Sequence, residues 1–178
     1  MPRRTLILAH ALAAALACAP ASLAAQGVAI EGGGTYLENR EEAVLSWGVG
    51  LYLPTGDRTI AALHYVQWEE GEGENRVERC GMDGCQSAGM HLLYRALGGT
   101  GYGWFLGGGV DLYERVVATD VADEFERDYV GAISASTMLA RGITDNLSVY
   151  ARAVVSSHAF AFDMRTAYVH AGIVLRVF

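Results

Sequence analysis

The sequence predicts an all-β protein, an eight-stranded antiparallel up-and-down transmembrane β-barrel that follows an N-terminal signal peptide. Three observations lead to this prediction. Long segments rich in Val, Ile, Leu, Tyr, Trp and Gly alternate with turn residues or acidic clusters. Within these segments apolar residues occupy every second position, which is the period of a strand. The connections are alternately short and long, as in membrane barrels, whose short turns gather at one end.

The first 25 residues have the features of a secretory signal peptide, and residues 26–178 are assigned to the barrel domain. Arg3 and Arg4 precede an apolar run rich in Ala and Leu, and the small residues of Ser22–Ala25 suit cleavage. Lipoprotein processing at Cys18 is an alternative. No later segment reaches the roughly 18 apolar residues that a transmembrane helix requires.

The expected strands span residues 27–38, 43–53, 59–70, 86–97, 102–117, 128–141, 147–158 and 166–178. Each is longer than the about 5–6 residues typical of globular strands, and a tilted strand needs about 9–11 residues to cross a bilayer. The short connections, rich in turn residues, are 54–58, 98–101 and 142–146. The longer and mostly acidic connections are 39–42, 71–85, 118–127 and 159–165.

Alternation along the strands predicts an apolar exterior and a polar interior. In the second strand Leu45, Trp47 and Val49 share one face, and Ser46 and Gly48 share the other. A soluble sandwich would also alternate, with its apolar face buried. On the polar faces, however, single charged residues or histidines stand among Gly, Ser and Ala. Small residues beside isolated charges favour a narrow polar interior over a solvated surface.

With its signal peptide, eight long alternating strands, short turns opposite acidic loops and a last strand "AGIVLRVF" ending on Phe178, the chain resembles the small eight-stranded outer-membrane β-barrel family of Gram-negative bacteria. The resemblance covers the whole mature chain and rests on architecture. It implies a place in the cell outer membrane, contact with its lipid and lipopolysaccharide, and recognition of the last strand, with Phe178 as assembly signal, by the barrel-assembly machinery. One departure is that Arg176, Gly172 and His170 share the parity of Phe178, where the family pattern repeats apolar residues.

The interior of an eight-stranded barrel is just wide enough for its own side chains. The polar residues expected there are Glu31, His64, His91, Arg95, Asp111, Arg115, Arg152, His170 and Arg176. We interpret them as a packed network of ion pairs and hydrogen bonds, because buried charges must be paired, and we expect Arg176 to point inward towards Glu31. One alternative is a narrow conduit whose histidines titrate near their ordinary pKa of about 6.5. Another is a metal site of His64, His91 and His170, although no short ligand spacing supports it.

The loops offer two further features. Cys80 and Cys85 have four residues between them, glycines included, in an exported chain, and this spacing predicts a disulfide that shapes the loop. Two cysteines alone do not make a metal site. The acidic residues of the long loops predict a solvated rim, and divalent-cation bridging to lipopolysaccharide or a basic extracellular partner is the functional alternative.

These observations together predict a monomeric outer-membrane barrel with a structural or surface-interaction role, without catalysis, cofactor or metal. A net charge of −7 argues against nucleic acid as a partner. The alternatives are a conduit for small solutes, a periplasmic lipocalin-like carrier of opposite polarity, and an enzyme that modifies outer-leaflet lipid. The residues that such an enzyme could use near the loop end are His158, Ser156, Ser157 and Asp163.

Overall fold

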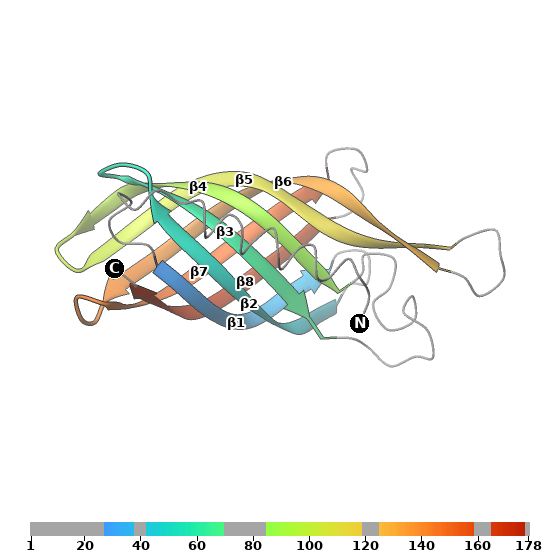
Figure 1. Cartoon of the computed structure of the whole chain (residues 1–178), viewed down its shortest axis with the longest axis horizontal. Coiled ribbons are helices and arrows are strands. Elements are labelled where there is room, and N and C mark those ends of the chain that lie inside the picture. The colour runs from blue at the N-terminus through green and yellow to red at the C-terminus, as the bar shows by residue number, and fades with distance from the viewer. Residues whose placement is uncertain (1–26, 38–41, 70–84, 119–124, 159–164, 177–178) are drawn as a thin grey trace.

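The chain forms a closed barrel in which each strand pairs antiparallel with its neighbours in sequence (Figure 1). The computed structural model describes residues 27–37, 42–69, 85–118, 125–158 and 165–176. The strands are β1 (Gly27–Leu37), β2 (Glu42–Pro54), β3 (Thr59–Trp68), β4 (Gln86–Gly99), β5 (Tyr102–Ala118), β6 (Phe125–Gly142), β7 (Leu147–His158) and β8 (Arg165–Arg176). No helix among these residues is long and apolar enough to cross a membrane.

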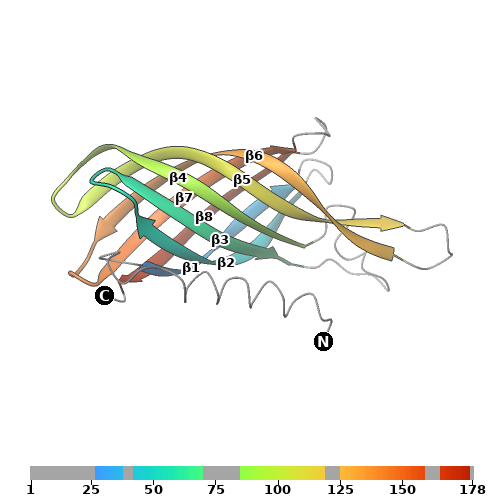
Figure 2. The ribbon, with the colours of Figure 1, turned by 45° about the horizontal axis from the view of Figure 1, so that its top comes forward.

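The eight predicted strands are confirmed, and their bounds differ from the prediction by a few residues. The clearest difference is at the start of β6, which begins at Phe125 because the pairing with β5 continues out to Ala118. This hairpin reaches beyond the other strands at the end where the long connections lie (Figures 1 and 2). We call that end the loop end and the opposite one the turn end.

Pairing between β1 and β8 closes the barrel. The register runs from Gly27 opposite Arg176 to Leu37 opposite Thr166, so the sheet closes on itself along the whole of β1. Closure matters in lipid because no water is available there to satisfy the backbone groups of an open edge. The predicted signal peptide, Cys80 and Phe178 lie outside the described residues, and their assignments remain predictions.

The three short connections lie together at the turn end, on the left of Figure 1, where β1 also begins and β8 ends. Between β4 and β5, Gly98 and Gly101 adopt φ values of 153° and 84°, which other residues rarely do. A register shift between Arg95 and Leu97 precedes this turn.

The barrel is apolar outside, and its buried charges lie inside, as the alternation predicts. Leu45, Ile133 and Val169 are 70%, 66% and 63% exposed, whereas Asp111 and Arg152 are each 1% exposed. Such a surface is unfavourable in water and favourable in lipid. It excludes the lipocalin-like carrier, whose polarity would be the reverse.

Candidate functional site: the polar layer inside the barrel

The polar side chains inside the barrel form a layer between two apolar clusters. Along β3, for example, the inward residues from the turn end upward are Ala62, His64 and Val66, and the first and last belong to different clusters. The turn-side cluster consists of Ala29, Tyr52, Ala62, Leu93, Phe105, Met138 and Tyr150. The loop-side cluster consists of Leu37, Val66, Trp68, Cys85, Tyr113, Ala132, Val154 and Tyr168. The interior therefore has an apolar cluster towards each end and a polar layer at mid-height.

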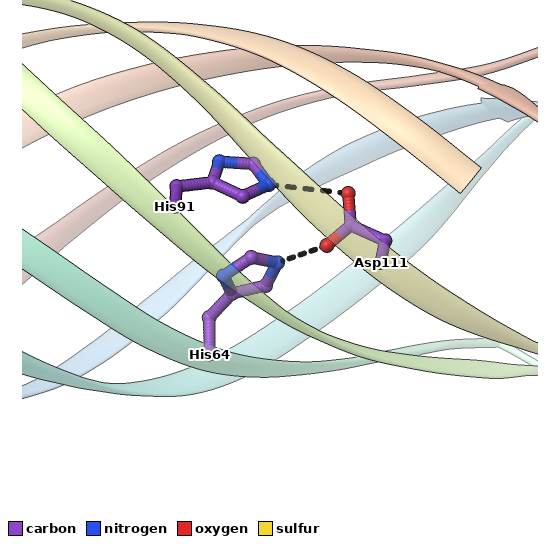
Figure 3. A group of neighbouring side chains, drawn as sticks. All are labelled: His64, His91 and Asp111. Atoms are coloured by element: carbon purple, nitrogen blue, oxygen red, sulfur yellow. Dashed lines mark hydrogen bonds and ion pairs between the residues drawn. The ribbon is translucent and has the colours of Figure 1, made fainter. Parts of the chain in front are cut away.

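Asp111 is the centre of this polar layer (Figure 3). Its Oδ1 lies 2.8 Å from His64 Nε2, and its Oδ2 lies 3.2 Å from His91 Nε2. The hydroxyl groups of Ser134 and Ser156 also donate to Oδ2, the latter at 3.3 Å. A carboxylate has about four acceptor sites, so these donors compensate for the water that Asp111 has lost.

Arg152 approaches both histidines from the side opposite Asp111. Its Nη2 lies 2.6 Å from His91 Nδ1 and 3.4 Å from His64 Nδ1. A guanidinium can only donate hydrogen bonds, so each Nδ1 must be the acceptor and each Nε2 must carry the ring proton. That proton is then directed at Asp111. The geometry thus assigns one neutral tautomer to both rings and links a buried cation to a buried anion through two imidazoles.

His64, His91 and Asp111 also have the residue types of a metal site, with ligand atoms within 4.8 Å of one another. A metal bound at Nε2 of a neutral imidazole requires the ring proton on Nδ1. At His91 that proton would face the N–H of Arg152 across 2.6 Å, where the present arrangement has a hydrogen bond. The three residues therefore fit a hydrogen-bonded network better than a metal centre.

A second polar group surrounds Glu31. Its Oε2 accepts a hydrogen bond from Tyr150 Oη at 2.5 Å, and its Oε1 lies 3.3 Å from His170 Nδ1. On the other side of that ring, His170 Nε2 lies 2.6 Å from Ser46 Oγ, which accepts from Thr35 Oγ1 at 2.8 Å. Ser46 is then free to donate to Nε2, which leaves the proton of His170 on Nδ1, facing Glu31. His170 is therefore separate from the His64–His91 pair, unlike in the trio considered from the sequence.

Glycines in the neighbouring strands make room for these side chains. Gly89 stands opposite Asp111 in the β4–β5 register, and a Cβ there would overlap Asp111 Oδ1. Gly109 stands opposite His91, and a Cβ there would lie 2.5 Å from His91 Cδ2. The glycine-rich strands thus hold large polar groups inside a narrow barrel.

Arg152 carries the cationic charge of the layer. Its Nε and Nη1 have no hydrogen-bond partner within the described part of the chain, and its Cζ lies 5.9 Å from the centre of the Tyr168 ring. An aromatic face at this distance attracts a guanidinium. The carboxylates of Asp111 and Glu31 supply the compensating negative charge in the same layer.

The structure brings six of the predicted residues into this layer: Glu31, His64, His91, Asp111, Arg152 and His170. It places Arg95 and Arg176 at the turn end instead, where they donate to the backbone carbonyls of Asp57 and Asp145 at 3.1 and 3.2 Å. The expected contact of Arg176 with Glu31 is wrong. Arg176 pairs with Gly27, four residues closer to the turn end, and remains exposed. The side chain of Arg115 lies outside the described residues.

The hydroxyl groups that complete the network were not among the predicted site residues. Thr35, Ser46, Ser134 and Ser136 are all buried, and Ser136 Oγ lies 3.2 Å from His91 Nδ1. A signal was present, because each stands on the face of its strand opposite to the exposed apolar residues. Parity alone did not reveal that they bond to those residues.

The candidate catalytic group at the loop end is not supported. Ser156 is buried inside the barrel, where it accepts a hydrogen bond from Tyr113 Oη at 2.7 Å and contacts Asp111. It therefore does not face lipid. The side chains of His158 and Asp163 lie outside the described residues, and Ser157 points to the opposite face of β7 from Ser156.

No family model and no curated protein matches the chain. Solved structures do resemble it. Neisserial surface protein A is 12% identical with a TM-score of 0.65, and the match covers 85% of this chain and 96% of that one. The N-terminal β-barrel domain of Pseudomonas aeruginosa OprF is 14% identical with a TM-score of 0.59, covering 84% and 96%. Ail, the attachment invasion locus protein of Yersinia pestis, is 9% identical with a TM-score of 0.58, covering 86% and 98%.

At these identities the likeness establishes the fold. The chain has the fold of the small eight-stranded outer-membrane β-barrels of Gram-negative bacteria. This fold, together with the apolar exterior, is that of a protein of the outer membrane.

Proposed function

We propose that the protein is an integral outer-membrane barrel with a structural or surface-interaction role and a closed interior, and that it is neither a conduit nor an enzyme. The position of the polar layer between two apolar clusters is the observation that carries this proposal. A solute crossing the barrel would have to displace Leu93 on the turn side and Trp68 on the loop side, which are 0% and 1% exposed. Ions and polar solutes cross apolar constrictions poorly.

The polar layer in this proposal serves the barrel itself. Its members come from strands that are far apart in sequence, such as Arg152 on β7 and His91 on β4. Because a buried charge without its partner is costly, the layer favours the one register in which all its groups meet. Its role is to make the wall of the barrel stiff and its closure specific.

The loop end would then provide the contacts with the surroundings. Residues 70–84 and 119–124 lie outside the described residues, but their sequence is strongly acidic. We propose that they form a solvated rim near lipopolysaccharide, shaped by a Cys80–Cys85 disulfide, and that a divalent cation or a basic partner is what they would bind. Assembly through Phe178 by the barrel-assembly machinery and a monomeric state belong to the same proposal, and the acidic rim makes nucleic acid an unsuitable partner.

Conductance in planar bilayers tests the proposal. We expect the purified mature barrel to insert, and to migrate differently on a gel with and without boiling, without conductance above the lipid baseline. Conductance that Arg152→Ala or Asp111→Ala alters would show that ions cross the polar layer, and would establish the conduit. Recovery in the soluble fraction of cells would contradict the membrane placement.

A further inference from the structure

Arginines gather at the turn end of the barrel: Arg58, Arg95, Arg141 and Arg176. Three of them are held by their own chain. Arg58 donates to Tyr94 Oη at 3.4 Å, and Arg95 and Arg176 donate to turn carbonyls. Arg141 is exposed, and within the described residues no hydrogen bond or ion pair engages its side chain. Among the described arginines of this rim, Arg141 is therefore the one whose side chain is available to a ligand.

Arg141 lies at one end of a groove on the lipid-facing surface. The groove has a volume of about 620 Å³ and crosses the outside of the barrel from the end of β4 to β7. The apolar side chains that line it are Leu97, Trp104, Leu139, Val149 and Ala151. Arg141 pairs with Tyr102, the first residue of β5, so it marks the turn end of the groove.

Local contacts give the groove its shape. Ala151 is small and exposed beside the larger Leu139 and Val149, which leaves a depression in the wall. Trp104 donates from Nε1 to Thr137 Oγ1 at 2.8 Å, and this hydrogen bond fixes the indole along one side. An apolar depression with a free guanidinium at the end nearest the aqueous phase matches an amphipathic anion.

We propose that this groove binds one anionic phospholipid of the periplasmic leaflet. One acyl chain lies over Leu139 and Ala151, beside Trp104, and the phosphate lies on Arg141. A guanidinium can bind two phosphate oxygens at once, and a basic residue near an anionic membrane surface contributes about 1 kcal/mol. The site rests on the membrane placement proposed above, with the short turns on the periplasmic side.

Tryptophan quenching can test the site, because the chain has three tryptophans in distinct places. Trp104 lines the groove, Trp47 is half exposed on β2, and Trp68 is buried inside. The mature barrel is reconstituted in unlabelled phosphatidylcholine vesicles with increasing fractions of acyl-brominated phosphatidylglycerol or acyl-brominated phosphatidylcholine. The Trp47→Phe variant reports the quenching of Trp104, and the Trp104→Phe variant reports the quenching of Trp47. Trp68 contributes the same background fluorescence in both variants.

We expect Trp104 to reach half-maximal quenching at an about fivefold lower fraction of phosphatidylglycerol than of phosphatidylcholine, the ratio that corresponds to about 1 kcal/mol. Trp47 should show a ratio near one. Arg141→Gln should bring this ratio for Trp104 close to one, and Arg141→Lys should retain part of the preference for phosphatidylglycerol. Arg58→Gln removes a charge at the same rim and should leave the ratio unchanged. Ala151→Phe, which fills the groove, should weaken quenching by phosphatidylglycerol more than Ala135→Phe, at an exposed position of β6 outside the groove lining.

Equal quenching of Trp104 by both lipids would overturn the site, as would equal losses in Arg141→Gln and Arg58→Gln, which would indicate only a general attraction of the rim. Failure of the membrane placement is distinguishable, because Trp47 would then be quenched by neither lipid. Heat-dependent gel migration of each variant shows that it is folded before it is compared.

Discussion

Arg152 on β7 donates to Nδ1 of His91 on β4 across 2.6 Å, although the two residues lie 61 positions apart in the sequence. Both side chains are almost fully buried. Because the guanidinium has no acceptor, the contact determines which nitrogen of the ring is protonated, and the opposite nitrogen faces Asp111. Strands β7 and β4 are therefore joined by a chain of hydrogen bonds in which Arg152 donates to His91 and His91 donates to Asp111.

Removing the cation should destabilise this chain strongly. Arg152→Met leaves a similar length of apolar side chain but leaves Asp111 and Glu31 without their buried partner, and breaking a buried charge pair costs about 3–5 kcal/mol. Urea unfolding of the barrel in lipid vesicles, followed by tryptophan fluorescence, measures the loss. Arg58→Gln, at an exposed turn position, should change the free energy of unfolding by less than about 0.5 kcal/mol. Similar losses in both variants would mean that the position of Arg152 is not special.

The histidine tautomers offer a direct spectroscopic prediction. Nitrogen-15 NMR of the ring atoms should show His64 and His91 protonated on Nε2, and His170 protonated on Nδ1, because Arg152 donates to the first two and Ser46 donates to the third. In Arg152→Met the preference of His91 should weaken, while that of His170 should persist. Nδ1-protonated rings at His64 and His91 in the wild-type chain would contradict the assigned network.

Any larger residue at position 89 should destabilise the barrel, because a Cβ there would overlap the carboxylate of Asp111. We expect Gly89→Ala to lower the free energy of unfolding by about 1–3 kcal/mol, as overpacking of a close-packed interior does. Gly131→Ala on β6 is the matched control, since a Cβ at that position meets nothing within 4 Å. A loss at residue 131 equal to that at residue 89 would point to strand propensity instead of the contact with Asp111.

The wall of the barrel was predictable from the sequence, whereas the pairing inside it was not. Alternation of Leu45 and Trp47 with Ser46 has a period of two, so it assigns faces without knowledge of any other strand. Contacts such as Arg152 with His91 depend on tilt and on the register of several strands. The expected Arg176–Glu31 contact failed for this reason: Glu31 pairs with Gly172, and Arg176 lies four residues further down β8.

The apolar clusters above and below the polar layer were also missed, although the sequence contains a trace of them. On β3 the inward positions run Ala62, His64, Val66, and each strand considered alone gives only a short sequence of this kind. The layers become visible when the strands are aligned by register around the barrel. Register follows from hydrogen bonding between strands, which no single strand's sequence determines.

The exterior should reject charge at mid-height more strongly than at the rim. Ile133→Arg on β6 places a guanidinium in the middle of the lipid-facing surface, where the cost is about 2–4 kcal/mol, and Leu175→Arg places one near the turn end, where the cost is about 0–1 kcal/mol. Ile133 and Leu175 are 66% and 51% exposed, so the comparison concerns depth and not burial in protein. The free energies of unfolding in vesicles measure both. Equal effects of the two changes would contradict the placement of the barrel across the bilayer.

The hydrogen bond of Tyr150 with Glu31 should contribute more to the stability of the barrel than the similar hydrogen bond of Tyr113 with Ser156. The first is a 2.5 Å hydrogen bond to a carboxylate and the second a 2.7 Å bond between hydroxyl groups. Bonds to charged groups contribute about 1.5–3 kcal/mol and neutral ones about 0.5–1.5 kcal/mol. A double-mutant cycle of Tyr150→Phe with Glu31→Gln should therefore give a larger coupling energy than one of Tyr113→Phe with Ser156→Ala. All four residues are buried in the same barrel, so loss of packing largely cancels between the cycles. Equal couplings would indicate that Glu31 is protonated inside the barrel and that its bond with Tyr150 is a neutral one.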